Sequence, residues 1–176
     1  RGAGSNSIVS RSIMIEKKIL SIAFEEYSSV DELSNSDKNL CLESEKAMSS
    51  SHSPYSGFRV GVAVQLESGR IVYGSNQENV AYPSGLCAER VALFAIGSAY
   101  PEDKIISMAV TAQTDHFEIK EPVTSCGACL QVMAEYEKKQ SSPINVLFYC
   151  RNGSIIRTQG IKSLLPFAFA ETRLQK

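Results

Sequence analysis

The chain has 176 residues, a formal net charge of −1 at pH 7, 43% hydrophobic residues and 21% charged residues. These values indicate a globular protein of one domain and exclude a fibrous or fully disordered chain. The near-neutral charge disfavours nucleic acid as a partner. Since no apolar run approaches the ~20 residues that span a bilayer, we expect no membrane partner either.

The N-terminal residues 1–13 are small and polar, with scattered arginines, and they lack the apolar core of a secretory signal. We interpret them as a disordered leader or a cloning remnant, and residues 14–176 as a single domain. Residues 17–27 are rich in β-branched and aromatic side chains, which predicts an edge strand. Residues 37–51 have apolar positions near helical spacing and predict a helix, with Ser36 as its cap.

A hairpin is predicted next, because the valine-rich residues 58–67 and residues 70–75 flank a Ser-Gly turn. Residues 76–85 are polar and irregular, and they contain a proline and a glycine, which is typical of a functional loop. The apolar residues 86–100 predict a helix, and Ser84 is a candidate cap for it.

The second half of the chain alternates strands with helices. Residues 105–112 predict a buried strand, and residues 125–139 predict an amphipathic helix with Ser125 as its cap. Residues 144–150 and 154–158 predict two more strands. We expect the tail after Gly160 to be helical, with its apolar anchor at Leu164–Phe169. This alternation is typical of the α/β class.

Five cysteines occur in the chain, and this odd number without an export signal argues against a disulfide framework. Cys126 and Cys129 lie three positions apart, on one face of the first turn of a predicted helix, and Cys87 begins another helix. Three thiolates meeting there would make a zinc site with its fourth position free, as in catalytic sites. The remaining cysteines, Cys41 and Cys150, are expected in the core.

Glu89 follows Cys87 by two residues, so its carboxylate is expected within reach of the water of such a site. Three thiolates and Zn²⁺ sum to a charge of −1. The cluster therefore needs a nearby cation for charge compensation, and Arg90 directly follows Glu89.

At this point the sequence resembles the cytidine deaminase family, in its small homotetrameric zinc-dependent type. The matching blocks occur in the family's order and together cover residues 37–170. These blocks are SPYSGFRVG (53–61), GSNQENVAY (74–82), CAER (87–90), CGACLQV (126–132) and LLPFAF (164–169).

The resemblance implies a three-layer α/β/α fold with a mixed five-stranded sheet and one zinc ion per subunit. It implies hydrolytic deamination of cytidine or deoxycytidine to uridine or deoxyuridine plus ammonia, for pyrimidine salvage in the cytoplasm. It also implies a homotetramer in which neighbouring subunits complete each site. Tyr82 and Phe169 match the aromatic residues that reach a neighbouring subunit's site.

The resemblance also assigns roles at the metal. Cys87, Cys126 and Cys129 match the zinc ligands. Glu89 matches the catalytic proton shuttle, which protonates the ring at N3 and later moves a proton to the departing amine.

Five further positions match the substrate-binding residues of the family. Asn76 and Glu78 match the pair that binds the ribose hydroxyls, although the same residues would also suit a turn and a solvated loop charge. Phe58 matches an aromatic that lines the base pocket, and the backbone at Ala88 and Ser125 matches groups that read the pyrimidine edge.

The sequence departs from the family at two positions. The family usually has proline where this chain has Ser125, and arginine where it has Leu130. If that arginine helps to neutralise the thiolates, Arg90 carries more of the burden here. Two alternatives stay open: a deaminase of another aminated heterocycle such as blasticidin S, and a zinc-stabilised nucleoside-binding protein with weak or no catalysis.

Overall fold

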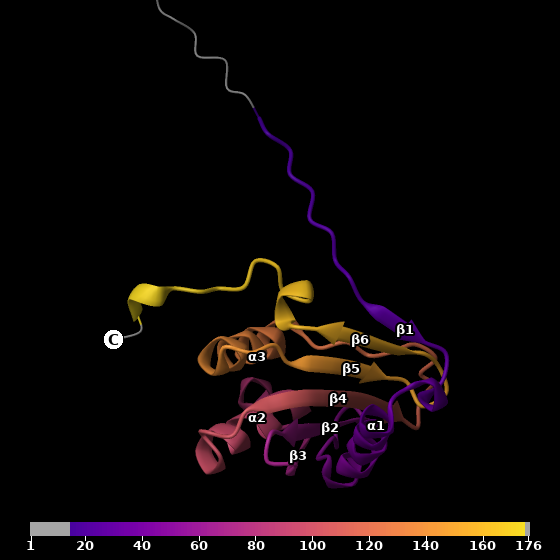
Figure 1. The fold of residues 1–176 in the computed structure, drawn as a ribbon. Coiled ribbons are helices and arrows are strands. Elements are labelled where there is room, and N and C mark those ends of the chain that lie inside the picture. Colours follow the sequence, from indigo (N-terminus) through magenta and orange to yellow (C-terminus); the bar gives the residue numbers. More distant parts are fainter. Residues whose placement is uncertain (1–14, 175–176) are drawn as a thin grey trace, which may run out of the picture.

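The fold is built on one mixed sheet, which a computed structural model describes within residues 15–174 (Figure 1). Its strand order is β1-β6-β5-β4-β2-β3, and β4 and β5 form its parallel pair, while the other neighbours are antiparallel. The strands are β1 (Glu25–Tyr27), β2 (Phe58–Leu66), β3 (Ile71–Ser75), β4 (Ile105–Thr114), β5 (Asn145–Tyr149) and β6 (Ile155–Gln159). The resemblance predicted five strands, and the short edge strand β1 is the sixth.

Helices cover both faces of the sheet and give the predicted three layers. Helix α1 (Asn35–Ala47) packs on one face, while α2 (Ala88–Ala99) and α3 (Gly127–Gln140) pack on the other. None of the helices among residues 15–174 is long and apolar enough to cross a membrane.

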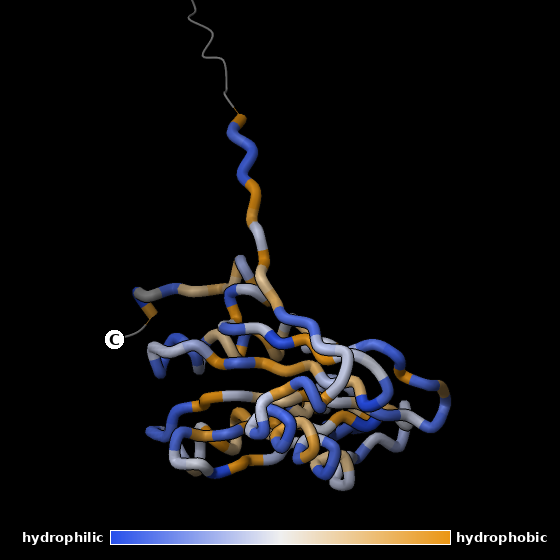
Figure 2. The backbone as a smooth tube through the Cα atoms, turned by 45° about the vertical axis from the view of Figure 1, so that its right-hand side comes forward, coloured by the Kyte–Doolittle hydropathy of each residue, from blue (hydrophilic) through white to orange (hydrophobic). Residues whose placement is uncertain are grey.

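The two-residue alternation of the central strands divides the core between these faces. In β2, Val62 and Val64 pack in the cluster with α2 and α3, whereas Ala63 packs in the cluster with α1. Strands β4 and β5 alternate in the same way. Both of their faces are buried, and Figure 2 shows hydrophobic stretches running through the middle of the body. The predicted hairpin is confirmed, with Gly69 at a φ of +85° in its turn.

Two glycines allow helices to approach the sheet closely. A Cβ added at Gly61 would lie 2.1 Å from the carbonyl oxygen of Ser44 in α1. A Cβ added at Gly74 would lie 2.3 Å from the carbonyl oxygen of Ala88, at the start of α2. The second contact seats the first turn of α2 directly on β3.

We expect Gly61→Ala to lower the free energy of unfolding by about 2–3 kcal/mol, because overpacking a rigid backbone contact typically costs 1–3 kcal/mol or more. Urea denaturation measures this change. Gly127→Ala is the matched control, since a Cβ there meets nothing within 4 Å. Equal effects of both substitutions would contradict this account of the Gly61 contact.

Helix α1 differs from its prediction at both ends. Its N-cap is Ser34, whose hydroxyl accepts a hydrogen bond from the Asp37 amide at 3.1 Å, so the prediction of Ser36 was wrong. Ser36 lies inside the helix and donates to Gln65 instead. The helix ends at Ala47 and continues as a 3-10 turn over Met48–Ser50.

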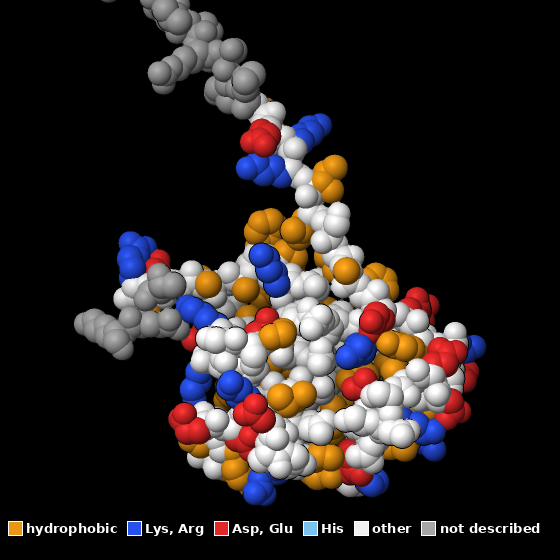
Figure 3. Space-filling model, in the orientation of Figure 1, with side chains coloured by type: hydrophobic (Ala, Val, Ile, Leu, Met, Phe, Trp, Pro, Cys, Tyr) orange, Lys and Arg blue, Asp and Glu red, His pale blue; other side chains and the backbone are white. Residues whose placement is uncertain are grey.

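Both ends of the described chain are less regular than predicted. Only the last three residues of the predicted edge strand 17–27 pair with β6, and the preceding residues extend from the body as an arm (Figure 3). The tail forms 3-10 turns at Ile161–Ser163 and Thr172–Leu174, so the helical prediction was wrong. Pro166 explains this, since proline lacks an amide hydrogen and disfavours helical geometry in the preceding residue. The predicted leader lies outside the described residues.

Candidate active site

Two helices begin at cysteines on the same side of the molecule. Cys87 is the N-cap of α2 and Cys126 is the N-cap of α3, with φ/ψ angles of −69°/152° and −70°/160°. The predicted caps were therefore wrong: Ser84 lies in a preceding 3-10 turn, and Ser125 lies one residue before the cap. Neither helix has a side-chain cap, so its first amide groups remain free to stabilise a thiolate.

The three predicted ligands form a compact sulfur cluster. The sulfur atoms of Cys87, Cys126 and Cys129 all lie within 4.8 Å of one another, and the last two are 3.5 Å apart. Zinc bonds of ~2.3 Å in tetrahedral geometry would separate sulfurs by ~3.8 Å, so this donor set fits zinc. Cys129 is buried and Cys126 is exposed, which leaves the cluster open on one side.

The two remaining cysteines lie outside the cluster. Cys41 and Cys150 are buried, at 0% and 3% exposure, which confirms their prediction as core residues. Three protein ligands therefore leave one position for water or substrate, as in catalytic zinc sites.

Arg90 provides the positive charge beside the thiolates. Its Nη2 lies 3.7 Å from the Cys87 sulfur, and its buried Nε has no hydrogen-bond partner in the described chain. A hydrogen bond from Cys129, assisted by Arg90, lowers the pKa of Cys87 to about 5. The same contact with Cys87, together with burial, raises the pKa of Cys129. Without metal, the thiolate charge of this pair therefore resides on Cys87.

Position 130, where the family usually has arginine, lies in the core of this chain. Leu130 is buried at 8% exposure and packs in the core with Cys129 and Met133. It therefore contributes packing and no charge to the metal cluster. The guanidinium of Arg90 is the group that contacts the thiolates.

We expect Arg90→Met to weaken zinc affinity by about 10- to 100-fold, the usual effect of removing an outer partner of a metal ligand. Competition with a chromophoric chelator measures the affinity. Arg59→Met is the control, because Arg59 pairs with Asp115 on an exposed loop. Unchanged zinc affinity in Arg90→Met would contradict the compensating role.

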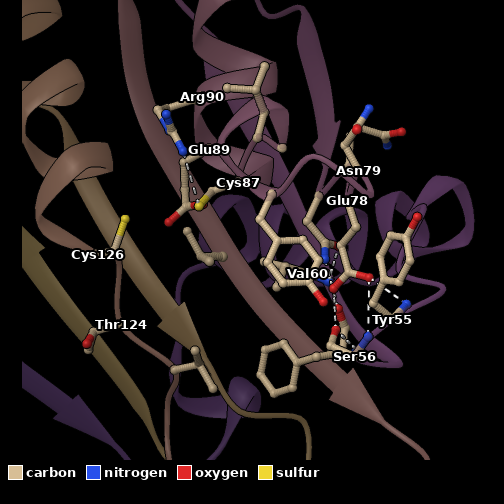
Figure 4. Close-up of a pocket in the computed structure, with 18 residues that line it drawn as sticks. Tyr55, Ser56, Val60, Glu78, Asn79, Cys87, Glu89, Arg90, Thr124 and Cys126 are labelled. Carbon is tan, nitrogen blue, oxygen red and sulfur yellow. Dashed lines mark hydrogen bonds between the residues drawn. The ribbon is translucent and has the colours of Figure 1, made fainter.

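Glu89 lies in the first turn of α2 and is 4% exposed. Within residues 15–174 its carboxylate has no hydrogen-bond partner, and its oxygens are not among the fully buried atoms, so they are accessible from the cavity that Glu89 lines. Its place beside Cys87 and Arg90 suits a group that exchanges protons with water or substrate (Figure 4).

A cavity of about 780 Å³ opens onto these residues, a size typical of small-molecule sites. Figure 4 shows the side chains of the β2 start, the loop after β3 and the α2 start around it. Its lining consists of Tyr55, Ser56, Phe58, Val60, Asn76, Gln77, Glu78, Asn79, Tyr82, Gly85, Leu86, Cys87, Glu89, Arg90, Val110, Val123, Thr124 and Cys126.

The two predicted sugar-binding residues line the cavity and also organise its walls. The Asn76 side-chain oxygen Oδ1 accepts from the Ser51 hydroxyl at 2.6 Å and from the Val60 amide at 2.8 Å, and its side-chain Nδ2 donates to the Phe58 carbonyl at 2.8 Å. One N–H of Asn76 therefore remains for a ligand.

The Glu78 carboxylate bridges to the loop before β2. It accepts from the Tyr55 amide at 2.9 Å and from the Ser56 hydroxyl and amide. The hydrogen bond from the Ser56 hydroxyl, followed by that from Tyr55, holds the pKa of Glu78 below its usual value. Its carboxylate is thus kept charged in the cavity wall.

The remaining predicted residues lie at different distances from the cavity. Phe58 lines it and packs against Phe117 with ring centroids 6.4 Å apart. Ala88 is fully buried and is not among the cavity residues, and the buried Ser125 hydroxyl has no hydrogen-bond partner among the described residues. The substrate-reading roles of the Ala88 and Ser125 backbones stay predictions.

The two aromatic residues that the resemblance assigns to a neighbouring subunit's site lie in different places in the single chain. Tyr82 lines the cavity of its own chain, where it meets Tyr55 edge-on at 5.9 Å. Phe169 is not among the cavity residues; it is 71% exposed, and Gln131 holds its backbone by two hydrogen bonds of 2.9 Å.

Sequence reasoning missed several cavity residues, notably Tyr55, Ser56, Val123 and Thr124. The first two lie inside the matching block 53–61, and the last two immediately precede Ser125 and the predicted zinc ligand Cys126. Their nearness to these motifs was the available signal.

Comparisons with known proteins agree with this geometry. A family model described as the cytidine and deoxycytidylate deaminase zinc-binding region matches residues 3–126. A cytidine deaminase from Sporosarcina psychrophila is 40% identical over 140 residues, covering 78% of this chain and 93% of the relative. One from Halalkalibacterium halodurans is 38% identical over 133 residues, covering 74% and 91%. The crystal structure of cytidine deaminase from Burkholderia pseudomallei superposes with a TM-score of 0.65 at 30% identity, covering 78% of this chain and all of that one.

Proposed function

The chain belongs to the cytidine and deoxycytidylate deaminase family, and on that premise we propose that it hydrolyses cytidine or deoxycytidine to uridine or deoxyuridine and ammonia. The observation that carries the proposal is the Glu89 carboxylate, which has no hydrogen-bond partner among the described residues and lies beside a three-cysteine cluster that fits zinc. Both groups open onto a cavity large enough for a nucleoside.

Cys87, Cys126 and Cys129 would hold the zinc. When bound, zinc supplies the Lewis acidity that lowers the pKa of water toward neutrality. Glu89 accepts a proton from the attacking water, whose oxygen bonds to C4, and delivers that proton to N3 of the pyrimidine. Glu89 then moves the remaining proton of the added hydroxyl to the amino group, and the C4–N bond breaks to release ammonia. Arg90 keeps the thiolate cluster compensated.

The sugar is bound at the other end of the cavity. The spare N–H of Asn76 and the charged carboxylate of Glu78 suit a donor and acceptor pair for ribose hydroxyls. Phe58 lines the wall against which the base would stack. The cavity thereby favours a nucleoside over a free base.

We expect Glu78→Gln to lower kcat/KM for cytidine by about tenfold, mainly through KM, because a hydrogen bond to a charged group is worth more than one to a neutral group. Steady-state kinetics on purified protein measure the two constants. Glu102→Gln, at an exposed site away from the cavity, is the control. An unchanged KM for cytidine in Glu78→Gln would contradict the sugar-binding role.

We further propose that the enzyme is a homotetramer that acts in cytoplasmic pyrimidine salvage. Tyr82 and Phe169, which are 74% and 71% exposed, are available to contact a neighbouring subunit. The three thiol ligands bind zinc only while they are reduced, and this requirement supports a location in a reducing compartment such as the cytoplasm.

The deciding experiment combines zinc analysis with an ultraviolet deamination assay on the same sample. We expect one zinc per subunit and turnover of cytidine and deoxycytidine, but not of cytosine. Turnover of blasticidin S alone would indicate another heterocycle deaminase. Stoichiometric zinc and nucleoside binding without ammonia release would indicate a binding protein, and either result would overturn the proposal.

A further inference from the structure

The residues before β1 form an arm that exposes apolar side chains. Over residues 15–24 the chain stands off the body, and hydrophobic and hydrophilic stretches follow one another along it (Figures 2 and 3). Its large apolar side chains are 51–94% exposed: Ile15, Ile19, Leu20, Ile22 and Phe24. Such a patch on a folded protein normally marks an interaction surface.

The arm runs directly into an open edge of the sheet. Strand β1 pairs with β6 on one side, and it is the last strand of the sheet, so its other side has no strand beside it in the described chain. An exposed apolar strand at a free edge is a template for pairing with another strand. The two-residue alternation places Leu20, Ile22 and Phe24 on one face of the extended arm.

We propose that residues 17–27 pair antiparallel with the same segment of a second copy of this chain, with the two-fold axis at Ile22. The pairing would add a strand to the open edge of each sheet. Two-fold symmetry within one sheet keeps every residue on the same face in both strands, so the axis must pass through a residue position.

Charge complementarity selects Ile22 as the centre. In this register Lys18 faces the partner's Glu26, Leu20 faces the partner's Phe24, and Ile22 faces the partner's Ile22. The apolar pairs are thus flanked at both ends by opposite charges, which stabilise cross-strand pairs.

Other symmetric registers are worse. A centre at Ser21 brings Glu16 opposite the partner's Glu26, a repulsive pair, and its opposite-charge pair uses Glu25, which Arg157 already binds. A centre at Ala23 places Lys18 opposite the partner's Ser28 and Glu26 opposite the partner's Leu20, so neither charge meets an opposite one. A centre at Leu20 leaves Lys18 opposite the partner's Ile22.

The charged residues of the chosen register are available for new partners. Lys18 has a 3.6 Å contact with Glu16, but both side chains are more than three-quarters exposed, and such pairs contribute little. Glu25 points to the other face of the sheet, where Arg157 binds it at 2.8 Å. The pairing therefore leaves that intrachain ion pair in place.

Cysteine cross-linking tests the register in the zinc-loaded, full-length protein. Ile22→Cys would place two thiols opposite each other, whereas Leu20→Cys would place each thiol opposite the partner's Phe24. Leu20 and Ile22 are similarly exposed, at 55% and 51%, which makes the variants matched. The unsubstituted chain is the blank, since Cys41 and Cys150 are buried and the other three cysteines bind zinc.

Under mild oxidation we expect disulfide-linked pairs to form at least about tenfold faster for Ile22→Cys than for Leu20→Cys, because a disulfide needs Cα atoms within ~7 Å. Equal rates, or no linked pairs in either variant, would overturn the proposal. A tetramer formed through other surfaces would not reproduce this difference.

Charge reversal in the Ile22→Cys background gives an independent test. Lys18→Glu or Glu26→Lys alone places two like-charge pairs in the interface, and we expect cross-linking to slow by roughly fivefold. An equimolar mixture of the two variants restores opposite charges at both ends, and we expect the original rate between unlike chains. A mixture as slow as the separate variants would overturn the register.

Discussion

Glu89→Gln is expected to keep its zinc and to lose about 10³-fold or more in kcat, at the upper end of what a positioned proton-transfer group contributes. The amide has the shape of the carboxylate but cannot accept a proton from water. Because the Glu89 carboxylate makes no hydrogen bond with another described residue, the exchange breaks none. Ammonia release under saturating cytidine measures the loss.

Two further readouts separate lost chemistry from lost structure. Zinc content by elemental analysis should stay at one per subunit, and the thermal midpoint of unfolding should not fall. Turnover within tenfold of the parent would refute Glu89 as the proton shuttle. A loss of zinc in Glu89→Gln would instead assign Glu89 a part in holding the metal.

The fold was predictable wherever local pattern and burial agree. The β2–β3 hairpin follows from a valine-rich run, a Ser-Gly turn and a second strand, and the structure places it within a residue of the prediction. The helix starts were not predictable in the same way. Ser84 and Ser125 have better capping chemistry than cysteine, yet Cys87 and Cys126 occupy the caps. The tertiary packing that brings the three sulfurs together overrides the local preference for a serine N-cap.

The ends of the chain show a second limit of sequence reasoning. Residues 17–24 have the composition of a strand, but a strand forms only where another strand supplies hydrogen bonds. In the single chain, β6 supplies them only to Glu25–Tyr27. The proposed pairing of two arms would reconcile the predicted strand with the observed arm.

The metal cluster was predictable in part, because close sequence spacing fixes each half of it. Cys126 and Cys129 share a helical turn, and Glu89 lies two residues beyond Cys87, but only the packing of α2 beside α3 brings the two halves together. Tyr55 and Thr124 reach the cavity from loops whose placement depends on the whole sheet. Such residues carry no periodic signal of their own.

Cys129→Ser is expected to reduce zinc affinity by more than about 100-fold and to abolish detectable deamination. Cys129 is fully buried within the cluster, so no other described thiol can replace it. Serine is a poor zinc ligand at neutral pH because its hydroxyl stays protonated. Chelator competition and the cytidine assay measure the two losses.

Cys150→Ser provides the matched control for that loss. Cys150 is also buried, but its thiol donates to the Ile119 carbonyl at 3.3 Å outside the cluster, a bond that serine can replace. We expect this variant to retain zinc and activity. Because bound metal stabilises the state that binds it, added zinc should raise the thermal midpoint of Cys150→Ser but not that of Cys129→Ser. An equal rise in both variants would place the zinc elsewhere in the chain.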